Sequence, residues 1–382
     1  MVVIVSILSL QSILSLRNEV YSFVDFDDDD VIAGQFSGDI RGDAESPTST
    51  SSNSNNTIFI YLQLTSDSRP NPGYSIFKTD TLHRFGSGRY NFQVHENADC
   101  GNSACNLLDP NQSFTDHHNL APCIAVSKRP YCSPDLLRCS YPNCKTMITN
   151  DEFCSRNNYD IRGYYSANYP NQGYLPLGPR LDAWSAFQLL RQSPEFFIKP
   201  ASTRKYAFSA IFSKSTNPGR EYLATLLQRD NNTLPIYTAI ADQFNQIYRN
   251  HGEGQLNPQT YMEVLLDSVF TLTPAGHNPE CYRMYEAIEA GSIPVFVKGD
   301  LYITEQNMNH PCLEALHHWY DAPVLVLDAW DEIFPIVERL LGDLVALDEI
   351  QKKLGVWYDG FMRRVVREFE DFVIEPPVST PE

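Results

Sequence analysis

Arg283 and Glu286 stand three residues apart in the segment 279–291, PECYRMYEAIEAG, whose apolar spacing predicts a helix. Residues at this spacing share one helix face, so the guanidinium and the carboxylate should project side by side. An arginine can bind a phosphate group through two donors, and a carboxylate can accept hydrogen bonds from adjacent hydroxyls such as those of a ribose. A surface ion pair, worth about 0.2–0.5 kcal/mol, has the same spacing. The pair alone leaves both interpretations open.

The loop before this helix favours the first interpretation. Residues 269–273, VFTLT, predict a strand, and they continue into the loop 274–278, PAGHN. Gly276 has no Cβ, so the backbone can approach a ligand closely there. Asn278 is a typical helix N-cap and Pro279 suits a first helical turn, where unpaired N–H groups favour an anion. The loop is neither GxGxxG nor a Walker P-loop, so it predicts only a phosphate-friendly turn.

Helical and strand-like patterns alternate from Leu181 onward. Such alternation predicts a parallel sheet with helices on both faces, that is, a doubly wound domain. Ligands in this class bind beside the carboxyl ends of the strands, where the 274–278 loop would lie. The predicted strands are 204–212, 234–240, 269–273, 293–297 and 322–327; the predicted helices are 181–192, 218–228, 257–268, 279–291, 328–341 and 347–372.

The part of the chain before Leu181 has a different character. Residues 57–64, TIFIYLQL, predict a strand, whereas 66–180 are rich in Pro, Asn, Gly and Cys and show little periodicity. Seven of the nine cysteines lie there, which indicates disulfides in an oxidising compartment, a metal site or free core thiols. The absence of C-x2-C pairs favours disulfides. These cysteines are Cys100, Cys105, Cys123, Cys132, Cys139, Cys144 and Cys154, and glycosylation sequons at Asn55, Asn111 and Asn231 also favour the secretory pathway.

The amino-terminal 16 residues are uncharged and mostly aliphatic. They are shorter than the ~20 residues that span a bilayer, and their length suits a secretory signal, although no basic region precedes them. A signal peptide or membrane anchor is favoured over a buried strand or helix. Residues 25–56 are acidic and then rich in Ser and Asn, which predicts a linker. The net charge of −18, from 29 basic and 47 acidic residues, argues against a nucleic-acid groove.

Motifs in the carboxyl-terminal half resemble those of the exostosin-like glycosyltransferases. P-A-G, then E-C-Y-R-x-Y-E-A, then G-S-I-P-V occur in this order, and the likeness is greatest to the carboxyl-terminal domain of the ribitol xylosyltransferase type. YLPLGPR at 174–180, SAIFSKS at 209–215 and PVLVLDAWDEI at 323–333 also stand in the expected order. The resemblance covers about 170–345.

The resemblance implies an α/β fold of the GT-B type, in which two Rossmann-like domains face across a cleft. It implies transfer of a sugar, with xylose as a candidate, from a UDP-linked donor to a glycan acceptor. By position, Glu286 would bind the donor ribose, Arg283 the diphosphate and Arg220 a second phosphate. The remaining donor contacts would be Gly276 in the loop, with His277 and Glu280 at the sugar or base.

The expected mechanism is inverting and metal-independent, with basic residues and a helix dipole stabilising the leaving group. No DxD triplet follows a predicted strand. The catalytic base stays unnamed: Asp116, His117 and His118 form the densest cluster, and Asp160 and Asp182 are equally open. His317 and His318, beside Trp319, are given a structural role. Cys281 is expected to be a small buried residue, with a disulfide to Cys312 as an alternative.

Two other functions remain open: a lectin-like or degenerate glycosyltransferase fold without turnover, and a secreted disulfide-rich interaction protein. The regular alternation of predicted strands and helices after residue 200 argues that an interaction protein would not describe the whole chain. The expected location is the Golgi or ER lumen, with a membrane tether through the amino terminus as an option. The expected organisation is a signal segment (1–24), a linker (25–56), a Cys-rich acceptor-side domain (57–199), a nucleotide-sugar-binding domain (200–345) and a final helix (346–374).

Overall fold

The computed structural model describes most of the chain between Thr57 and Glu375. The predicted signal segment, the linker and the Asp116–His118 cluster lie outside the described residues. Within the described part, no helix combines the length and the apolar character that crossing a membrane requires. The described residues are 57–62, 75–78, 80–96, 122–127, 133–141, 143–149, 154, 158–229, 233–242, 256–301 and 312–375.

The first sheet is parallel throughout and has the strand order β2-β1-β3-β4-β5-β6. It confirms the strand predicted at 57–64, whose side chains at Ile58, Ile60 and Leu62 are fully buried. Its strands are β1 (Thr57–Leu62), β2 (Asn91–Glu96), β3 (Cys123–Ser127), β4 (Lys145–Ile148), β5 (Ile161–Arg162) and β6 (Gly173–Tyr174), and its short helices are α2 (Ser75–Lys78), α3 (Thr81–Phe85) and α5 (Pro134–Ser140).

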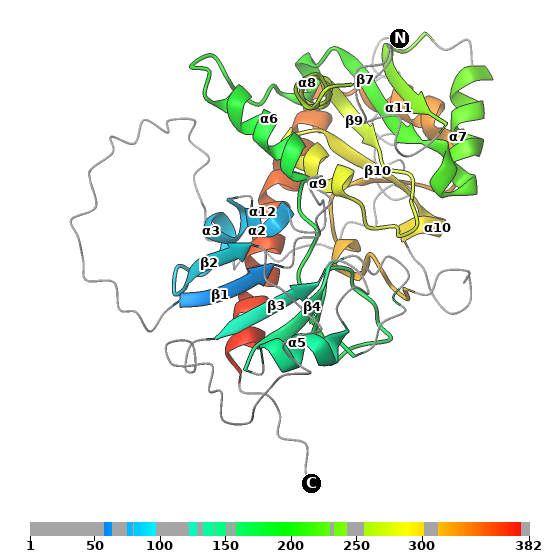
Figure 1. The fold of residues 1–382 in the computed structure, drawn as a ribbon. Helices are drawn as coiled ribbons and strands as arrows, with labels where there is room; N and C mark the ends of the chain where they lie inside the picture. Colours follow the sequence, from blue (N-terminus) through cyan, green and yellow to red (C-terminus); the bar gives the residue numbers. More distant parts are fainter. Residues whose placement is uncertain are drawn as a thin grey trace, which may run out of the picture. The chain divides into compact units, whose positions relative to one another are not determined.

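The second sheet is also parallel, with the order β11-β10-β9-β7-β8. Every residue of β9 is buried, as expected for a strand covered on both faces. Figure 1 shows α8 and α9 on one face of this sheet and α7 and α11 on the other. The strands are β7 (Tyr206–Ser213), β8 (Ile236–Ala241), β9 (Ser268–Leu272), β10 (Ile293–Val297) and β11 (Leu325–Leu327); the helices are α7 (Pro218–Arg229), α8 (Pro258–Leu266), α9 (Tyr282–Glu289), α10 (Lys298–Leu301) and α11 (Ile333–Leu341), with 3-10 turns at η4 (Ala201–Thr203), η5 (Lys214–Thr216), η6 (His317–Trp319) and η7 (Trp330–Glu332).

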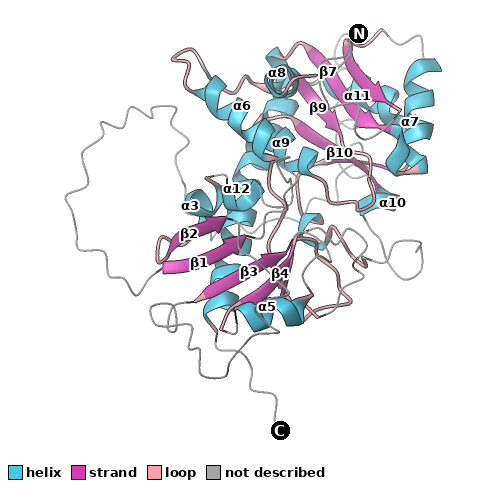
Figure 2. Cartoon of the chain, viewed as in Figure 1, coloured by secondary structure: helices cyan, strands magenta, loops and turns pink. Residues whose placement is uncertain are grey.

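The two sheets share one topology. The first sheet is followed from β2 and the second from β8, and the strands of each are numbered in chain order. Both orders then begin 2-1-3-4-5, which is a doubly wound order with a switch point between the first and third strands. Figure 2 shows the strands and the helices of this arrangement by type. The predicted α/β class with two Rossmann-like parts, as in a GT-B architecture, is therefore confirmed.

Helix α6 (Leu181–Arg191) packs on the second sheet's side of the molecule. Its buried Trp184 and Phe187 share a hydrophobic cluster with Tyr261 and Met262 of α8. The predicted domain boundary at 199/200 therefore falls after a helix whose apolar partners lie beyond that boundary. The domain limits themselves stay a prediction.

The long helix α12 (Leu344–Ile374) contacts elements of both sheets, among them α3, β6, α9 and β10. Its Glu370 is fully buried and accepts a hydrogen bond from the backbone N–H of Ser87 across 3.1 Å. Arg84 of α3 donates to Glu289 of α9 through two bonds of 2.8 and 3.0 Å. The buried face of α12 consists of Leu347, Leu354, Tyr358, Phe361, Met362, Val365, Val366, Phe369, Glu370 and Val373.

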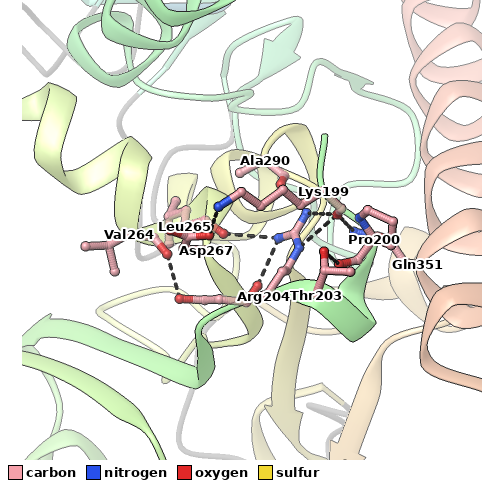
Figure 3. A network of polar contacts seen from close by, with 10 residues as sticks. Lys199, Pro200, Thr203, Arg204, Val264, Leu265, Asp267, Ala290 and Gln351 are labelled. Atoms are coloured by element: carbon pink, nitrogen blue, oxygen red, sulfur yellow. Dashed lines mark hydrogen bonds and ion pairs between the residues drawn. The ribbon is translucent and has the colours of Figure 1, made fainter. Parts of the chain in front are cut away.

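Arg204, a buried arginine at the amino-terminal edge of the second sheet, shares the carbonyl of Lys199 with Gln351 of α12 (Figure 3). Burial lowers the pKa of Arg204 to about 10, and its guanidinium donates to the backbone carbonyls of four residues. Gln351 of α12 donates to the carbonyls of Lys199 and Gly291 at 3.1 and 2.6 Å. Gly291 has φ +69°, a left-handed conformation that favours glycine. The carbonyls that accept from Arg204 belong to Lys199, Leu265, Ser268 and Ala290.

Two disulfides lie within the described residues, Cys123–Cys144 and Cys154–Cys312. The first joins the start of β3 to the residue that precedes β4. The second joins residues that are 158 apart in the sequence. The alternative of a bond between Cys281 and Cys312 is wrong, because Cys312 bonds to Cys154 and Cys281 carries a free thiol.

Candidate functional site

The loops that follow β7 and β9 begin at the switch point of the second sheet. These strands are neighbours, with Ser209 paired to Thr271. The chain leaves β7 toward α7 and leaves β9 toward α9, and these helices lie on opposite faces of the sheet (Figure 1). Doubly wound proteins bind ligands in the crevice that such a divergence opens. Five of the six predicted donor residues, at 276–286, follow β9, and Arg220 follows β7.

Arg220 connects the two loops. Its Nε donates to the carbonyls of Pro274 and Ala275 at 3.2 and 2.8 Å, and its Nη1 donates to the carbonyl of Ser213 at 3.3 Å. The side chain is buried, as expected for a group that satisfies several backbone carbonyls. The predicted phosphate contact is thus also the residue that fixes the position of the loop after β9.

Gly276 lies against this guanidinium. A Cβ at residue 276 would stand 3.2 Å from Nη2 of Arg220, closer than an ordinary van der Waals contact. The carbonyl of Gly276 accepts from Nδ2 of Asn217 at 3.2 Å, which adds a second connection between the loops. Close approach at Gly276 is therefore explained by a side chain of the protein itself.

Asn278 organises the loop instead of capping the helix. Its Oδ1 accepts from the backbone N–H of Glu280 at 2.9 Å, and its Nδ2 donates to Sγ of Cys312 at 3.2 Å. Because these contacts use the side chain, the helix begins later than predicted, with Cys281 as the N-cap and Tyr282 as the first residue. The prediction that Asn278 is the N-cap is wrong. His277, beside it, is exposed.

Positive charge gathers at the start of α9. Burial raises the pKa of the Cys281 thiol, while the charges of Arg283 and Arg220 act in the opposite direction. Both guanidinium groups are buried, and both are close enough to influence the same sulfur atom. Their charges add to the positive end of the helix dipole, an arrangement that favours an anion.

Glu286 is buried on α9 and joins three segments. Its Oε1 accepts from the backbone N–H of Arg180 at 3.1 Å and from Nε of the same residue at 3.2 Å. Its Oε2 accepts from the hydroxyl of Tyr261, on α8, at 2.5 Å. A carboxylate has about four acceptor positions, so these three bonds do not exhaust it. Its predicted contact with a ribose stays a proposal.

Glu280 joins the site to the first sheet. Its Oε1 accepts from the hydroxyls of Tyr174, in β6, and Tyr285, in α9, at 2.7 and 2.5 Å. Burial raises its pKa to about 7, although hydrogen bonds from both tyrosines and from backbone groups of Leu177 and Tyr165 oppose the shift. The carboxyl group can therefore change its protonation state near neutral pH.

Several of these partners were not identified as site residues from the sequence. The motif YLPLGPR, 174–180, is distinguished in the sequence only by its order in the chain, and it supplies both Tyr174 and Arg180. In the sequence, Tyr261 occupies one apolar position of the helix predicted at 257–268. Their roles depend on contacts between residues up to 106 apart, which no local pattern reveals.

Two of the residues left open as the catalytic base, Asp160 and Asp182, lie within the described part of the chain. Asp160 accepts from the backbone N–H and the hydroxyl of Thr146, both at 2.7 Å. Because Asp160 precedes β5 and Thr146 lies near the start of β4, these bonds connect the starts of the two strands. Asp182 accepts from the backbone N–H of Ala183 at 2.9 Å, in the first turn of α6. Within the described segments, no group of three or more His, Cys, Asp or Glu side chains could hold a metal ion.

Comparison with known proteins identifies the carboxyl-terminal half. The family model of the RXYLT1 C-terminal domain matches residues 188–376. Ribitol-5-phosphate xylosyltransferase 1 of Mus musculus is 29% identical over 171 residues, which cover 44% of this chain and 37% of the mouse protein. The Homo sapiens protein of that name is 26% identical over 178 residues, which cover 44% of this chain and 38% of the human protein. The chain spans about two fifths of the length of the curated relatives it matches.

Solved structures show more distant likenesses. An alpha-glucosyltransferase in complex with UDP and DNA aligns with a TM-score of 0.42 and 11% identity, over 79% of this chain and 94% of that one. A Staphylococcus aureus MnaA–UDP co-structure aligns with a TM-score of 0.39 and 10% identity, over 85% and 100%. The assignment depends on the sequence match, which contains both switch-point loops. Residues 188–376 belong to the family of the ribitol xylosyltransferase carboxyl-terminal domain, of the exostosin-like type that the motifs indicate.

Proposed function

We propose that the protein is a glycosyltransferase that moves a sugar from a UDP-linked donor to a glycan acceptor in the lumen of the Golgi or the ER. The observation that carries this proposal is the family match over 188–376, since that segment contains the loops after β7 and β9. The convergence of Arg220 and Arg283 at the start of α9 supports it, because a nucleotide diphosphate needs a site that favours anions.

Each donor contact has a proposed role. Arg283 binds the diphosphate at the start of α9, and Arg220 supplies a second phosphate contact while it holds the loop. Glu286 accepts from the ribose hydroxyls, for which the bonds from Arg180 and Tyr261 orient it. Gly276, His277 and Glu280 line the sugar or base end of the donor.

The donor sugar, stereochemistry and acceptor are finer proposals. Xylose is the first donor sugar to test and a glycan carrying ribitol phosphate the first acceptor, because the matched relatives are named for these groups. The transfer is inverting, and the leaving diphosphate is stabilised by the arginines and the helix dipole. The two described disulfides are consistent with the lumenal location.

The test has two stages. Purified full chain should gain thermal stability with UDP, as expected for any ligand that binds only the folded state. A panel of UDP-sugars with glycan acceptors should then give transfer, with UDP-xylose among the active donors. A protein that binds UDP but transfers no sugar would favour the alternative of a degenerate, non-catalytic glycosyltransferase fold, and absence of UDP binding would contradict the proposed donor site.

A further inference from the structure

His317 and Glu314 form a dyad on the surface of the described chain. Nδ1 of His317 lies 3.3 Å from Oε2 of Glu314, and the two side chains are 48% and 40% exposed. A carboxylate at one ring nitrogen orients an imidazole and stabilises its protonated form, which leaves the second nitrogen available for proton transfer. From the sequence, a structural role is expected for this histidine and for His318. The structure separates the two, because burial lowers the pKa of His318 to about 4, while His317 is open to solvent.

Aromatic rings hold the dyad in place. Tyr165, from the loop after β5, stacks on the ring of His317 with centroids 5.4 Å apart and an interplanar angle of 20°. The rings of His318 and Tyr320 meet the same imidazole edge-on, each at 5.4 Å. Together with Glu314, these are the ionisable groups that the described structure places against His317. Packing of this kind restricts the imidazole to one orientation, which a proton-transfer group needs.

Three contacts place the dyad beside the loop after β9. Asn278 of that loop donates to Sγ of Cys312, two residues before Glu314. Tyr174 donates its hydroxyl to Glu280 at 2.7 Å, and its ring stacks on His318 at 5.1 Å. The segment that carries His317 therefore packs on Asn278 of that loop and on Tyr174, the tyrosine that donates to Glu280.

Resting on the proposed function, we propose that His317 is the general base that deprotonates the acceptor hydroxyl, with Glu314 as its positioning residue. In this step the acceptor O–H bond breaks and its proton moves to Nε2 of His317. The acceptor oxygen forms a bond to the anomeric carbon, and the bond from that carbon to the diphosphate breaks, with UDP taking the electron pair. The exposed imidazole then returns its proton to water.

The experiment compares H317Q, H317A and E314Q in the full chain. A general base contributes about 10²–10⁴-fold to rate, so H317Q should lower kcat by that amount while the affinity for UDP stays unchanged. Added imidazole should restore part of the turnover of H317A. E314Q should lower kcat less than H317Q, with the KM for the acceptor and the affinity for UDP unchanged, because Glu314 only orients the ring of His317.

The matched control is H83Q, since His83 is an exposed histidine on α3 whose described ring contact is with Phe92. This variant should retain wild-type turnover. Wild-type-like kcat in H317Q, with active wild-type enzyme, would overturn the inference and leave the proposed function intact. Loss of UDP affinity together with kcat in H317Q would assign His317 to binding and would also overturn it. Absence of transfer by the wild type would contradict the proposed function itself.

Discussion

Nε of Arg220 lies 2.8 Å from the carbonyl oxygen of Ala275, so a side chain that follows β7 holds the loop that follows β9. The same guanidinium reaches the carbonyl of Ser213 at the end of β7. One residue thus spans the switch point of the second sheet and brings positive charge to it. This arrangement couples the shape of the loop to the charge that would meet a diphosphate.

Replacing Arg220 with Ala should therefore impair both folding and binding. The buried carbonyls of Ser213, Pro274 and Ala275 would lose a donor, and leaving a buried acceptor unsatisfied costs about 1–3 kcal/mol. The free energy of unfolding should fall, and UDP should give a smaller thermal shift. The matched control is R229A, at the exposed end of α7. Equal UDP affinity in R220A and R229A would contradict the role given to Arg220.

Replacing Glu286 tests whether it recognises a ribose. E286A should abolish transfer and destabilise the protein, because Arg180 and Tyr261 would lose their common buried acceptor. E286Q keeps the shape of the side chain. If Glu286 accepts from the ribose, the wild type should bind UDP more tightly than 2′-deoxy-UDP, and E286Q should reduce this difference. The Y261F variant, which removes one hydrogen bond to Glu286, serves as a control for indirect effects.

The structure of this region was only partly predictable from the sequence. The strand 269–273, the loop after it and the following helix were recognised because their patterns are local. The positions of Arg283 and Glu286 on that helix follow from the same periodicity. The donors to Glu286 could not be predicted, since Arg180 lies 106 residues away and Tyr261 belongs to another helix. The helix begins later than predicted because the side chain of Asn278 donates a hydrogen bond to Cys312 instead of capping the helix.

Glu280 should make stability depend on pH. Its pKa is about 7 in the folded protein, above the ordinary value of 4.5, so the folded state holds a proton more tightly than the unfolded state. This contribution is fully present below about pH 4.5 and is lost as the pH rises through 7. It amounts to a few kcal/mol at most, since one pKa unit corresponds to about 1.4 kcal/mol. Wild-type stability should therefore decline more steeply than that of E280Q between pH 5 and pH 7.5, as measured by urea unfolding. Parallel curves would contradict this role.

Removing the Cys154–Cys312 disulfide should affect the loop after β9 as well as stability. A disulfide of this kind contributes about 2–4 kcal/mol, and Cys312 is also the acceptor for Asn278. The double variant C154S/C312S should unfold at lower temperature and bind UDP more weakly. The control is C123S/C144S, whose bond joins the start of β3 to the residue before β4 and should affect stability alone. Equal UDP affinities in the two variants would show that the disulfide does not support the loop.

Two glycines offer a matched test of where the site lies. A Cβ at Gly291 would stand 2.5 Å from Cγ2 of Ile198 and 2.6 Å from Nη2 of Arg204, and the residue has φ +69°. G291A should therefore destabilise the protein by more than about 1 kcal/mol. Since Gly291 lies at the amino-terminal edge of the sheet, the folded fraction should still bind UDP with wild-type affinity. A Cβ at Gly276 would instead stand 3.2 Å from Nη2 of Arg220, which is a milder approach than either of these contacts at Gly291. G276A should therefore cost less stability than G291A, and it should weaken UDP binding more. Calorimetric titration of both variants checks this, and the reverse pattern would place the nucleotide at the opposite edge of the sheet.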